Sequence, residues 1–250
     1  MTTDEQRFLQ ELEIFRGECE AASQHLYAYL TIRRLARRRK SVLRALNRHA
    51  LFWNTAMGAL QQSALTTLGR AFDQDTPHNV DVLLRLASSA RSIFSRTSLA
   101  ARKAEAGVQA SWADSFAARA YEPTPNDFRT LRAHVKRARR IYERRYRELR
   151  NRVYAHTVAH GEAEVRPLAA QAHIGELKRL IVSLLSVHDI LWQLFWNGRA
   201  PVVGTVRYSA KPRGTISMQD PPRDRIVVEV EAILNQAARA NNALQQTRHG

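Results

Sequence analysis

The sequence predicts an all-α fold, an antiparallel helical bundle with a small C-terminal appendage. Apolar residues recur at steps of three and four over several long stretches, which is the period of an α-helix and not of a β-strand. Hydrophobic residues make up 44% of the chain, as is typical of a globular protein. With 250 residues the chain can bury one large core or a core plus a small appendage. We therefore expect a helical bundle domain over residues 1–200 and an appendage with a polar tail over residues 201–250.

The N-terminal stretch, from residue 3 to about residue 38, is predicted to form one long helix. Its apolar residues alternate at steps of four and three, and they are Phe8, Leu12, Phe15, Cys19, Ala22, Leu26 and Tyr29. So regular a stripe indicates either antiparallel packing in a bundle or a coiled coil between two copies of the chain.

A second helix is expected from about residue 41 to residue 73. Its apolar stripe consists of Leu43, Leu46, Ala50, Trp53, Met57, Leu60, Ala64 and Leu68. No glycine or proline separates this helix from the first, so the sequence does not mark the boundary between them. Asn79 is a suitable N-cap for a short helix over residues 80–90. Residues 91–122 are expected to form one or two less regular helices.

The next helix has a clear N-terminal signal. Thr124 suits the N-cap, Pro125 the first helical position, and Asp127 supplies an acid in the first turn. We expect the helix to continue until it ends or bends near residues 154–156. Its apolar stripe consists of Phe128, Leu131, Val135, Ala138, Tyr142, Leu149 and Val153.

Two tyrosines of this helix, Tyr142 and Tyr146, have two interpretations. They are expected to pack in the core, and the alternative is that they stack on the bases of a nucleic acid.

Residues 174–197 form a further apolar helix that Gly198 should end. Its apolar run is too short and too polar for a membrane span, so we expect a buried core helix. His188 and Asp189 of this helix are expected to be satisfied core or edge residues, the alternative being active-site auxiliaries. Because the N-terminus carries no apolar leader, we expect a cytoplasmic protein that does not enter the membrane.

The sequence changes in character beyond Pro201. Residues 202–208 and 215–218 alternate loosely and could form a short hairpin. A last helix is expected over residues 223–240, followed by a polar tail.

The charge of the chain points to a polyanionic partner. Basic residues number 39 against 23 acidic ones, which gives a formal net charge of +16, and phosphate neutralisation favours such a surface on a nucleic acid. Of the basic residues 34 are arginines, either because arginine binds phosphate in a bidentate manner or because the genome favours arginine codons. The candidate RNA-binding residues are Arg37, Arg38, Arg39, Arg140, Arg144 and Arg147, the alternative being solvated basic faces.

The sequence offers little for a metal or a cofactor. The single Cys19 excludes an intramolecular disulfide and a cysteine-based metal cluster. No metal-ligand spacing, phosphate-cradling glycine loop or serine or cysteine triad stands out. We therefore expect no cofactor.

One short motif carries the parts for phosphodiester chemistry. Arg150 and Asn151 are followed by His156. An arginine supplies a permanently charged fork for phosphate, and a histidine can give or take a proton near neutral pH. Six positions apart, the arginine and the histidine lie about 120° apart on a straight helix, so the helix must end or bend between them to bring them together.

This motif resembles the signature of the HEPN superfamily. A second stretch adds to the resemblance: Phe52, Trp53 and Asn54, then residues 65–73, then Asp75 and a short helix over residues 80–86. This arrangement is similar to the HEPN subgroup associated with phage abortive infection, the AbiU-like subgroup, and the likeness spans roughly residues 5–197.

The resemblance implies a four-helix or five-helix up-and-down bundle that commonly dimerises and is frequently a metal-independent endoribonuclease. Carried over by position, His156 would transfer protons, Arg150 would hold the phosphate, and Asn151 would orient one or both. Candidate auxiliaries are Arg70, Asp73, Tyr154 and His160. For Arg70 and Asp73 we favour an ion pair at a helix end that fixes the bundle, and the alternative is that they line the RNA cleft.

One histidine per chain cannot act as base and acid at once. A homodimer would supply the second. The stripes over residues 8–29 and 128–153 are the candidate contact surfaces between the two chains, and we favour the second because it carries the motif.

Three functions fit these observations. The first is a toxin-like or phage-defence ribonuclease, for which an antitoxin protein would be a partner. The second is a catalytically silent HEPN module that binds RNA or nucleotides or docks a partner. The third is a basic helical DNA-binding regulator, which we rank last because no helix-turn-helix punctuation is visible.

Overall fold

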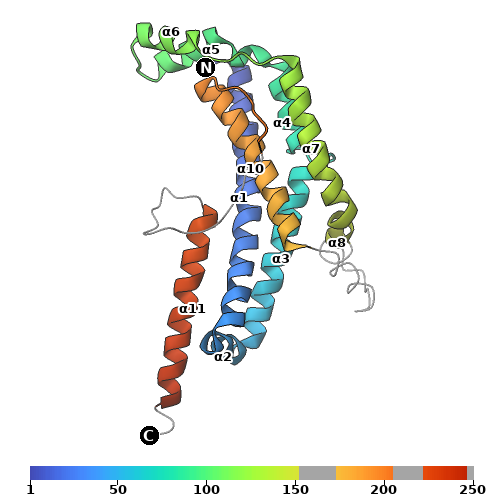
Figure 1. Ribbon diagram of the computed structural model, residues 1–250, viewed down its shortest axis with the longest axis vertical. Helices are drawn as coiled ribbons and strands as arrows, with labels where there is room; N and C mark the ends of the chain where they lie inside the picture. The colour runs from blue at the N-terminus through green and yellow to red at the C-terminus, as the bar shows by residue number, and fades with distance from the viewer. Residues whose placement is uncertain (152–172, 205–221, 247–250) are drawn as a thin grey trace. The chain divides into compact units, whose positions relative to one another are not determined.

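The computed structural model describes residues 1–151, 173–204 and 222–246, and over these three ranges the chain is helical and contains no strand. The all-α prediction is therefore confirmed. The elements in chain order are α1 (Thr3–Arg38), α2 (Lys40–Arg48), α3 (Ala50–Phe72), α4 (Val80–Ser89), the 3-10 helix η1 (Arg91–Phe94), α5 (Arg96–Glu105), α6 (Ala110–Ala118), α7 (Pro125–Arg145), α8 (Arg147–Leu149), α10 (Ile174–Asn197) and α11 (Pro222–Gln246) (Figure 1).

The chain divides into two compact units. Unit 1 comprises residues 1–19 and 68–207, and unit 2 comprises residues 20–67 and 208–250. The long helices α1 and α3 each contribute residues to both units. The sequence analysis divided the chain into residues 1–200 and 201–250. These units do not test that division, which stays a prediction.

Helix α1 has the predicted bounds, and its predicted apolar stripe is buried. Phe8 and Cys19 have no exposed surface, and of the seven predicted residues only Tyr29 is half-buried. The stripe packs within the chain, so a coiled coil between two copies along it is not formed, and the bundle interpretation holds.

The predicted second helix is wrong in one respect, because it is interrupted at His49. That residue has φ −122° and ψ 47°, which separates α2 from α3. Leu43, placed on the apolar stripe, is 44% exposed, whereas Val42 and Leu46 are buried. The interruption lets these two side chains pack on Leu234 of α11, in a cluster that also contains Ile32, Leu35 and Ala238. Tertiary packing inside unit 2 thus overrides the continuous helical period.

The short elements between α3 and α7 follow the prediction. The side chain of Asn79 accepts hydrogen bonds from the backbone N–H groups of Asp81 and Val82, at 2.9 and 3.1 Å, and so caps α4. Residues 91–122 form η1, α5 and α6, which agrees with the one or two less regular helices that were expected.

Helix α7 starts at Pro125 as predicted. The carboxylate of Asp127 accepts hydrogen bonds from the backbone N–H and the hydroxyl group of Thr124, at 2.7 and 2.8 Å. The described part of the predicted stripe is buried, and both Tyr142 and Tyr146 have no exposed surface. The core interpretation of these two tyrosines is therefore confirmed.

The predicted continuous helix beyond residue 145 is wrong. At Tyr146 φ is −115°, and α7 gives way to the short helix α8. The phenol of Tyr146 donates to the backbone oxygen of His173 at 3.0 Å and accepts from its N–H at 3.1 Å. This contact with a residue 27 positions later explains why the local sequence gave no sign of the interruption.

Helix α10 has the predicted bounds and ends at Gly198, whose φ of 56° lies in the left-handed region that glycine adopts most easily. By length and composition alone it could cross a membrane, a test that the core helix of a soluble protein also passes. Its residues from Leu180 to Phe195 supply eight buried side chains, which agrees with the expected core helix. One of them is His188, whose Nδ1 lies 3.3 Å from the exposed Asp189.

Helices α7 and α10 are also joined by a hydrogen bond between side chains. The hydroxyl of Ser183 and Nε2 of His134 lie 2.8 Å apart. Burial lowers the pKa of His134, so its ring is neutral near pH 7 and serves as a hydrogen-bonding group rather than as a cation.

Helix α11 runs from Pro222 to Gln246 and is six residues longer at its C-terminal end than predicted. Of the predicted hairpin only residues 202–204 are described, and they are not a strand. The rest of that hairpin lies outside the described residues.

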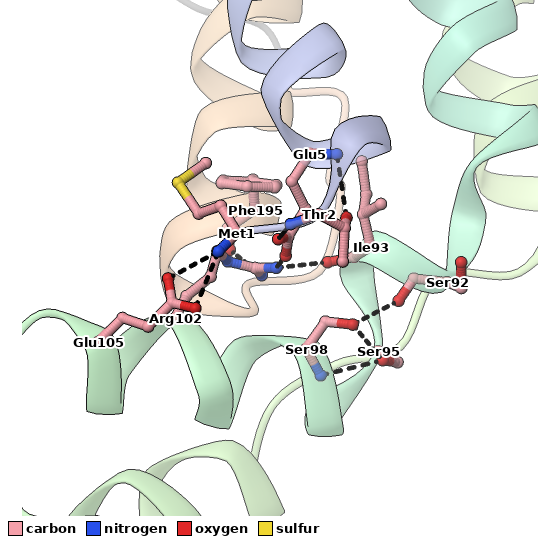
Figure 2. Close-up of polar contacts among 10 residues, drawn as sticks. All are labelled: Met1, Thr2, Glu5, Ser92, Ile93, Ser95, Ser98, Arg102, Glu105 and Phe195. Atoms are coloured by element: carbon pink, nitrogen blue, oxygen red, sulfur yellow. Dashed lines mark hydrogen bonds and ion pairs between the residues drawn. The ribbon is translucent and has the colours of Figure 1, made fainter.

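A buried arginine joins three parts of unit 1. Figure 2 shows the guanidinium of Arg102 between the first turn of α1, η1 and the end of α10. It forms an ion pair with Glu5, donates to the backbone oxygens of Ile93 and Phe195 at 2.7 Å each, and lies 3.9 Å from the centre of the Phe195 ring. Burial lowers the pKa of Arg102 and the hydrogen bond to Glu5 opposes the shift. Arg102 therefore stays charged, because arginine retains its proton at any ordinary pH.

We predict that Glu5→Ala lowers the free energy of unfolding by about 3–5 kcal/mol, because it leaves the charge of Arg102 buried without a partner. The control is Glu13→Ala, which removes an exposed ion pair with Arg16 and should cost at most about 1 kcal/mol. Urea denaturation of both variants measures the difference. Equal losses for the two would show that Arg102 does not depend on Glu5.

Candidate active site

The candidate site in unit 1 is built around Arg150, which follows α8. Its backbone N–H donates to the oxygen of Tyr146 at 2.8 Å, and its φ and ψ of −60° and −49° are helical. The short helix therefore fixes where the side chain starts. That side chain is 16% exposed, so it is held against the protein yet remains accessible from solvent.

The guanidinium of Arg150 is held by an acid and an amide. It forms a short ion pair with Asp73, the residue that follows α3. Its Nε and one terminal nitrogen donate to the side-chain oxygen of Asn151, at 3.0 and 2.7 Å. The sequence placed Asn151 as the residue that orients its neighbours, and its amide is in contact with Arg150.

These contacts engage only part of the guanidinium. An arginine side chain has five N–H groups, and the contacts with Asp73 and Asn151 engage three of them. One N–H remains on each of the two terminal nitrogens. Two N–H groups on a planar fork are what a bidentate contact with a phosphate requires.

Asp73 occupies a turn that is itself fixed. Its backbone N–H donates to the oxygen of Gly69 at 2.7 Å, and its own backbone oxygen accepts from the hydroxyl of Thr76 at 2.8 Å. Its carboxylate lies between two cations, since Nε of Arg147 is 3.9 Å away on the other oxygen. Two arginines around one carboxylate leave a positive charge at this end of α3 and α8.

Two aromatic residues, one of them the neighbour of Asp73, pack close to this site. The rings of Phe72 and Tyr142 are stacked, with their centres 5.4 Å apart. The hydroxyl of Tyr142 is buried and has no hydrogen-bond partner in the described part of the chain. Burial raises the pKa of Tyr142, so the phenol stays protonated and cannot act as a base near neutral pH.

Gly69 leaves the space that Arg150 occupies. A Cβ atom at this position would lie 2.8 Å from both Cδ of Arg150 and the hydroxyl oxygen of Tyr142, and nearer still to a terminal nitrogen of Arg150. The sequence analysis quoted residues 65–73 without seeing this role. The sequence did contain one indication of this role. A glycine inside a helix lowers stability by about 1 kcal/mol relative to alanine, so its presence suggests that a side chain would not fit there.

The start of α10 is held beside the same site. The hydroxyl of Tyr146 contacts His173, and Glu176 accepts a hydrogen bond from Arg145 at 3.0 Å. Burial raises the pKa of Tyr146 to about 12. Asn151 and His173 are thus both anchored near α8, and they flank residues 152–172. His156, Tyr154 and His160 lie outside the described residues.

The other predicted residues fall into three groups. Arg140, Arg144 and Arg147 are exposed along α7 and α8 in unit 1, and Arg37, Arg38 and Arg39 are exposed at the end of α1 in unit 2. Of these six, Arg39 donates to the side chain of Asn235 at 2.6 Å. Arg70 forms an ion pair with Glu18 at 2.9 Å.

The chain was compared with models of known families. The HEPN_AbiU2 family, described as AbiU2, matches residues 5–209. That range includes the whole of the Arg150 site. Comparison with curated proteins and with solved structures gives no match.

We predict that Gly69→Ala displaces the guanidinium of Arg150 and destabilises unit 1, because the new methyl group overlaps atoms that are fixed by an ion pair. The matched control is Gly58→Ala in the same helix, where a Cβ meets no atom within 4 Å and should stabilise the protein by about 1 kcal/mol. Thermal unfolding of both variants gives the sign of each change. A stabilised Gly69→Ala protein would contradict the described position of Arg150.

Proposed function

The chain belongs to the HEPN_AbiU2 family, and from this premise we propose that it is a metal-independent endoribonuclease, toxin-like or acting in phage defence. The observation that carries the proposal is the state of Arg150, which Asp73 and Asn151 hold in place while two of its N–H groups stay available.

The proposed reaction uses the nucleophile that RNA carries itself. The 2′-hydroxyl attacks the adjacent phosphorus, a base takes its proton, and the bond to the 5′-oxygen breaks as an acid supplies a proton to the leaving oxygen. The products are a 2′,3′-cyclic phosphate and a 5′-hydroxyl. We assign proton transfer to His156 and stabilisation of the crowded, negatively charged phosphorane to Arg150.

The arrangement around Arg150 supports this assignment through pre-organisation. Asn151 contacts two nitrogens of the guanidinium and so fixes its plane, and Asp73 fixes its far end. A group held before the reaction needs no reorganisation when charge develops in the transition state. The carboxylate does not cancel the field of the site, because Arg147 lies beside it as a second cation.

We propose that the exposed arginines of α7 and α8 bind the RNA backbone. Arg140 and Arg144 lie four residues apart and so share one face of α7, and Arg147 opens α8. Exposed cations of this kind contribute affinity through counterion release. Arg37, Arg38 and Arg39 of unit 2 are proposed to add to the same electrostatic attraction.

A second function, that of a silent RNA-binding or partner-docking module, is favoured by one observation. The ion pair of Arg150 with Asp73 joins α8 to the end of α3, which is a structural role that needs no reaction. Cleavage assays separate the two functions, because a silent module binds RNA and leaves it intact.

We predict that purified protein cleaves total RNA and that His156→Ala does not. Arg150→Ala should lose about 3 kcal/mol of transition-state stabilisation, by analogy with removal of one oxyanion donor, and Arg150→Lys should recover little because an ammonium group lacks the fork. The matched control is Arg144→Ala, an exposed position that should weaken binding yet cleave normally at saturating RNA. Wild-type turnover in His156→Ala would remove His156 from the mechanism.

We further propose that the enzyme is a cytoplasmic homodimer in which two copies of His156 act as base and acid, and that an antitoxin protein restrains it. The described residues of the apolar stripes over residues 8–29 and 128–153, which were expected as contact surfaces, are buried within the chain apart from the half-buried Tyr29. We therefore propose that the subunit contact uses another surface.

For the dimer we predict the outcome of mixing inactive His156→Ala chains into wild type. A heterodimer would have one histidine in the shared site and lack either base or acid. Activity should therefore fall toward the square of the wild-type fraction once subunits have exchanged. A decrease in simple proportion to that fraction, or full activity in a protein that sediments as a monomer, would contradict the shared site.

A further inference from the structure

A second concave surface of unit 1 lies apart from the Arg150 site. It is a cleft of about 500 Å³ between the first turns of α1, the outer face of α4 and one residue of α7. Its lining consists of Arg7, Glu11, Val82, Arg85, Leu86, Ser88, Ser89 and Arg132. None of these residues contributes to the contacts of Arg150 or Asp73.

The charges in this cleft are unbalanced. Three arginines from three separate helices line it together with one carboxylate, that of Glu11. Glu11 already contacts the ring of His78, at 3.0 and 3.1 Å. The nearby Asp81 is engaged as well, in an ion pair with Arg139 at 2.5 Å. The carboxylates that could have neutralised the cleft are thus in use.

The three arginines contrast with the buried arginines of the same unit. Each buried arginine, Arg102 for example, has a carboxylate partner. In the cleft, Arg132 donates only to a backbone oxygen, that of Leu84, at a long 3.4 Å. Arg7 and Arg85 have no hydrogen bond or ion pair within the described residues. Cations that converge in a hollow repel one another unless an anion lies between them.

The rest of the lining suits an organic phosphate rather than a bare ion. Val82, Arg85, Leu86 and Ser89 follow at steps of three, one and three, which places them on one face of α4. They offer an apolar floor beside a cation and a hydroxyl. A cleft of this volume lies within the range that holds small-molecule ligands, about 300–1,000 Å³.

We propose that this cleft is a nucleotide-binding site in which Arg7, Arg85 and Arg132 hold the phosphate. The proposal goes beyond the cleavage of RNA, since it concerns residues outside the Arg150 site. The phosphate group that these arginines bind could belong to a free nucleotide or to the end of an RNA strand.

The test is titration calorimetry with two probes on the full chain. One probe is adenosine 5′-monophosphate. The other is a 5′-phosphorylated 2′-O-methyl RNA dodecamer, which cannot be cleaved through its 2′-oxygen. The same dodecamer without the phosphate is its reference. The variants are Arg7→Gln and Arg85→Gln, both at exposed positions, so each should fold. Arg119→Gln changes an exposed arginine that follows α6 outside the cleft and is the matched control, and Arg150→Gln reports on the other site.

We expect both cleft variants to weaken binding of the mononucleotide at least about tenfold, as for loss of a charged hydrogen bond, while Arg119→Gln and Arg150→Gln retain it. The mononucleotide result could be absent while the 5′-phosphate still strengthens binding of the dodecamer to the wild type but not to the cleft variants. The phosphate would then come from an RNA end, and the proposed site would be supported. Equal binding by the cleft variants and Arg119→Gln, or a loss confined to Arg150→Gln, would overturn the proposal. Either result would leave the proposed ribonuclease untouched, because cleavage is measured separately.

Discussion

The burial of the Arg102 guanidinium is the constraint on which unit 1 depends. A charge withdrawn from water must find its full set of partners, and those of Arg102 come from the first turn of α1, from η1 and from the end of α10. Once these three segments are fixed, Phe8 packs against Phe94 and Phe195, and Phe94 against Phe128 of α7. Helix α7 leads to α8 and Arg150. The position of the candidate site therefore depends on an ion pair at the opposite end of the same helices.

Arginines also satisfy backbone carbonyl groups at the C-terminal ends of helices. Arg102 donates to the backbone oxygen of Phe195 in the last turn of α10, and Arg139 donates to that of Phe72 at the end of α3. Cations near the C-terminus of a helix satisfy its free carbonyl groups and interact favourably with its dipole. Part of the arginine excess of this chain is thus structural. Composition alone left codon bias and phosphate binding open as reasons for this excess, and Arg102 and Arg139 show a third, structural use of arginine.

The sequence predicted elements whose signals are local. The stripe of α1, the capping residues Thr124 and Asp127 and the stop at Gly198 each gave the correct bound, because each depends on residues within one or two turns. It failed at His49 and Tyr146, where the helix is interrupted by packing or by a hydrogen bond with a distant residue.

The candidate site shows the same division between local and distant contacts. Arg150 and Asn151 are neighbours and could be read from the motif. The pairing of Arg150 with Asp73, the space at Gly69 and the convergence of Arg7 with Arg85 and Arg132 join residues far apart in the chain, and no local pattern encodes them. The assignment of proton transfer to His156 remains a prediction from the motif.

The ion pair between Arg150 and Asp73 bears on how the proposed enzyme meets its substrate. If the arginine had to leave Asp73 in order to bind phosphate, binding would first cost the separation of a largely buried pair. Arg150 does not have to leave Asp73, because its contacts with Asp73 and Asn151 engage three of its five N–H groups and two remain for a phosphate. The negative charge of Asp73 beside an incoming phosphate is offset by Arg147 on its other side. Asp73 therefore orients the guanidinium of Arg150, and because Arg147 lies on its other side, the net charge that an RNA phosphate would meet at this site is still positive.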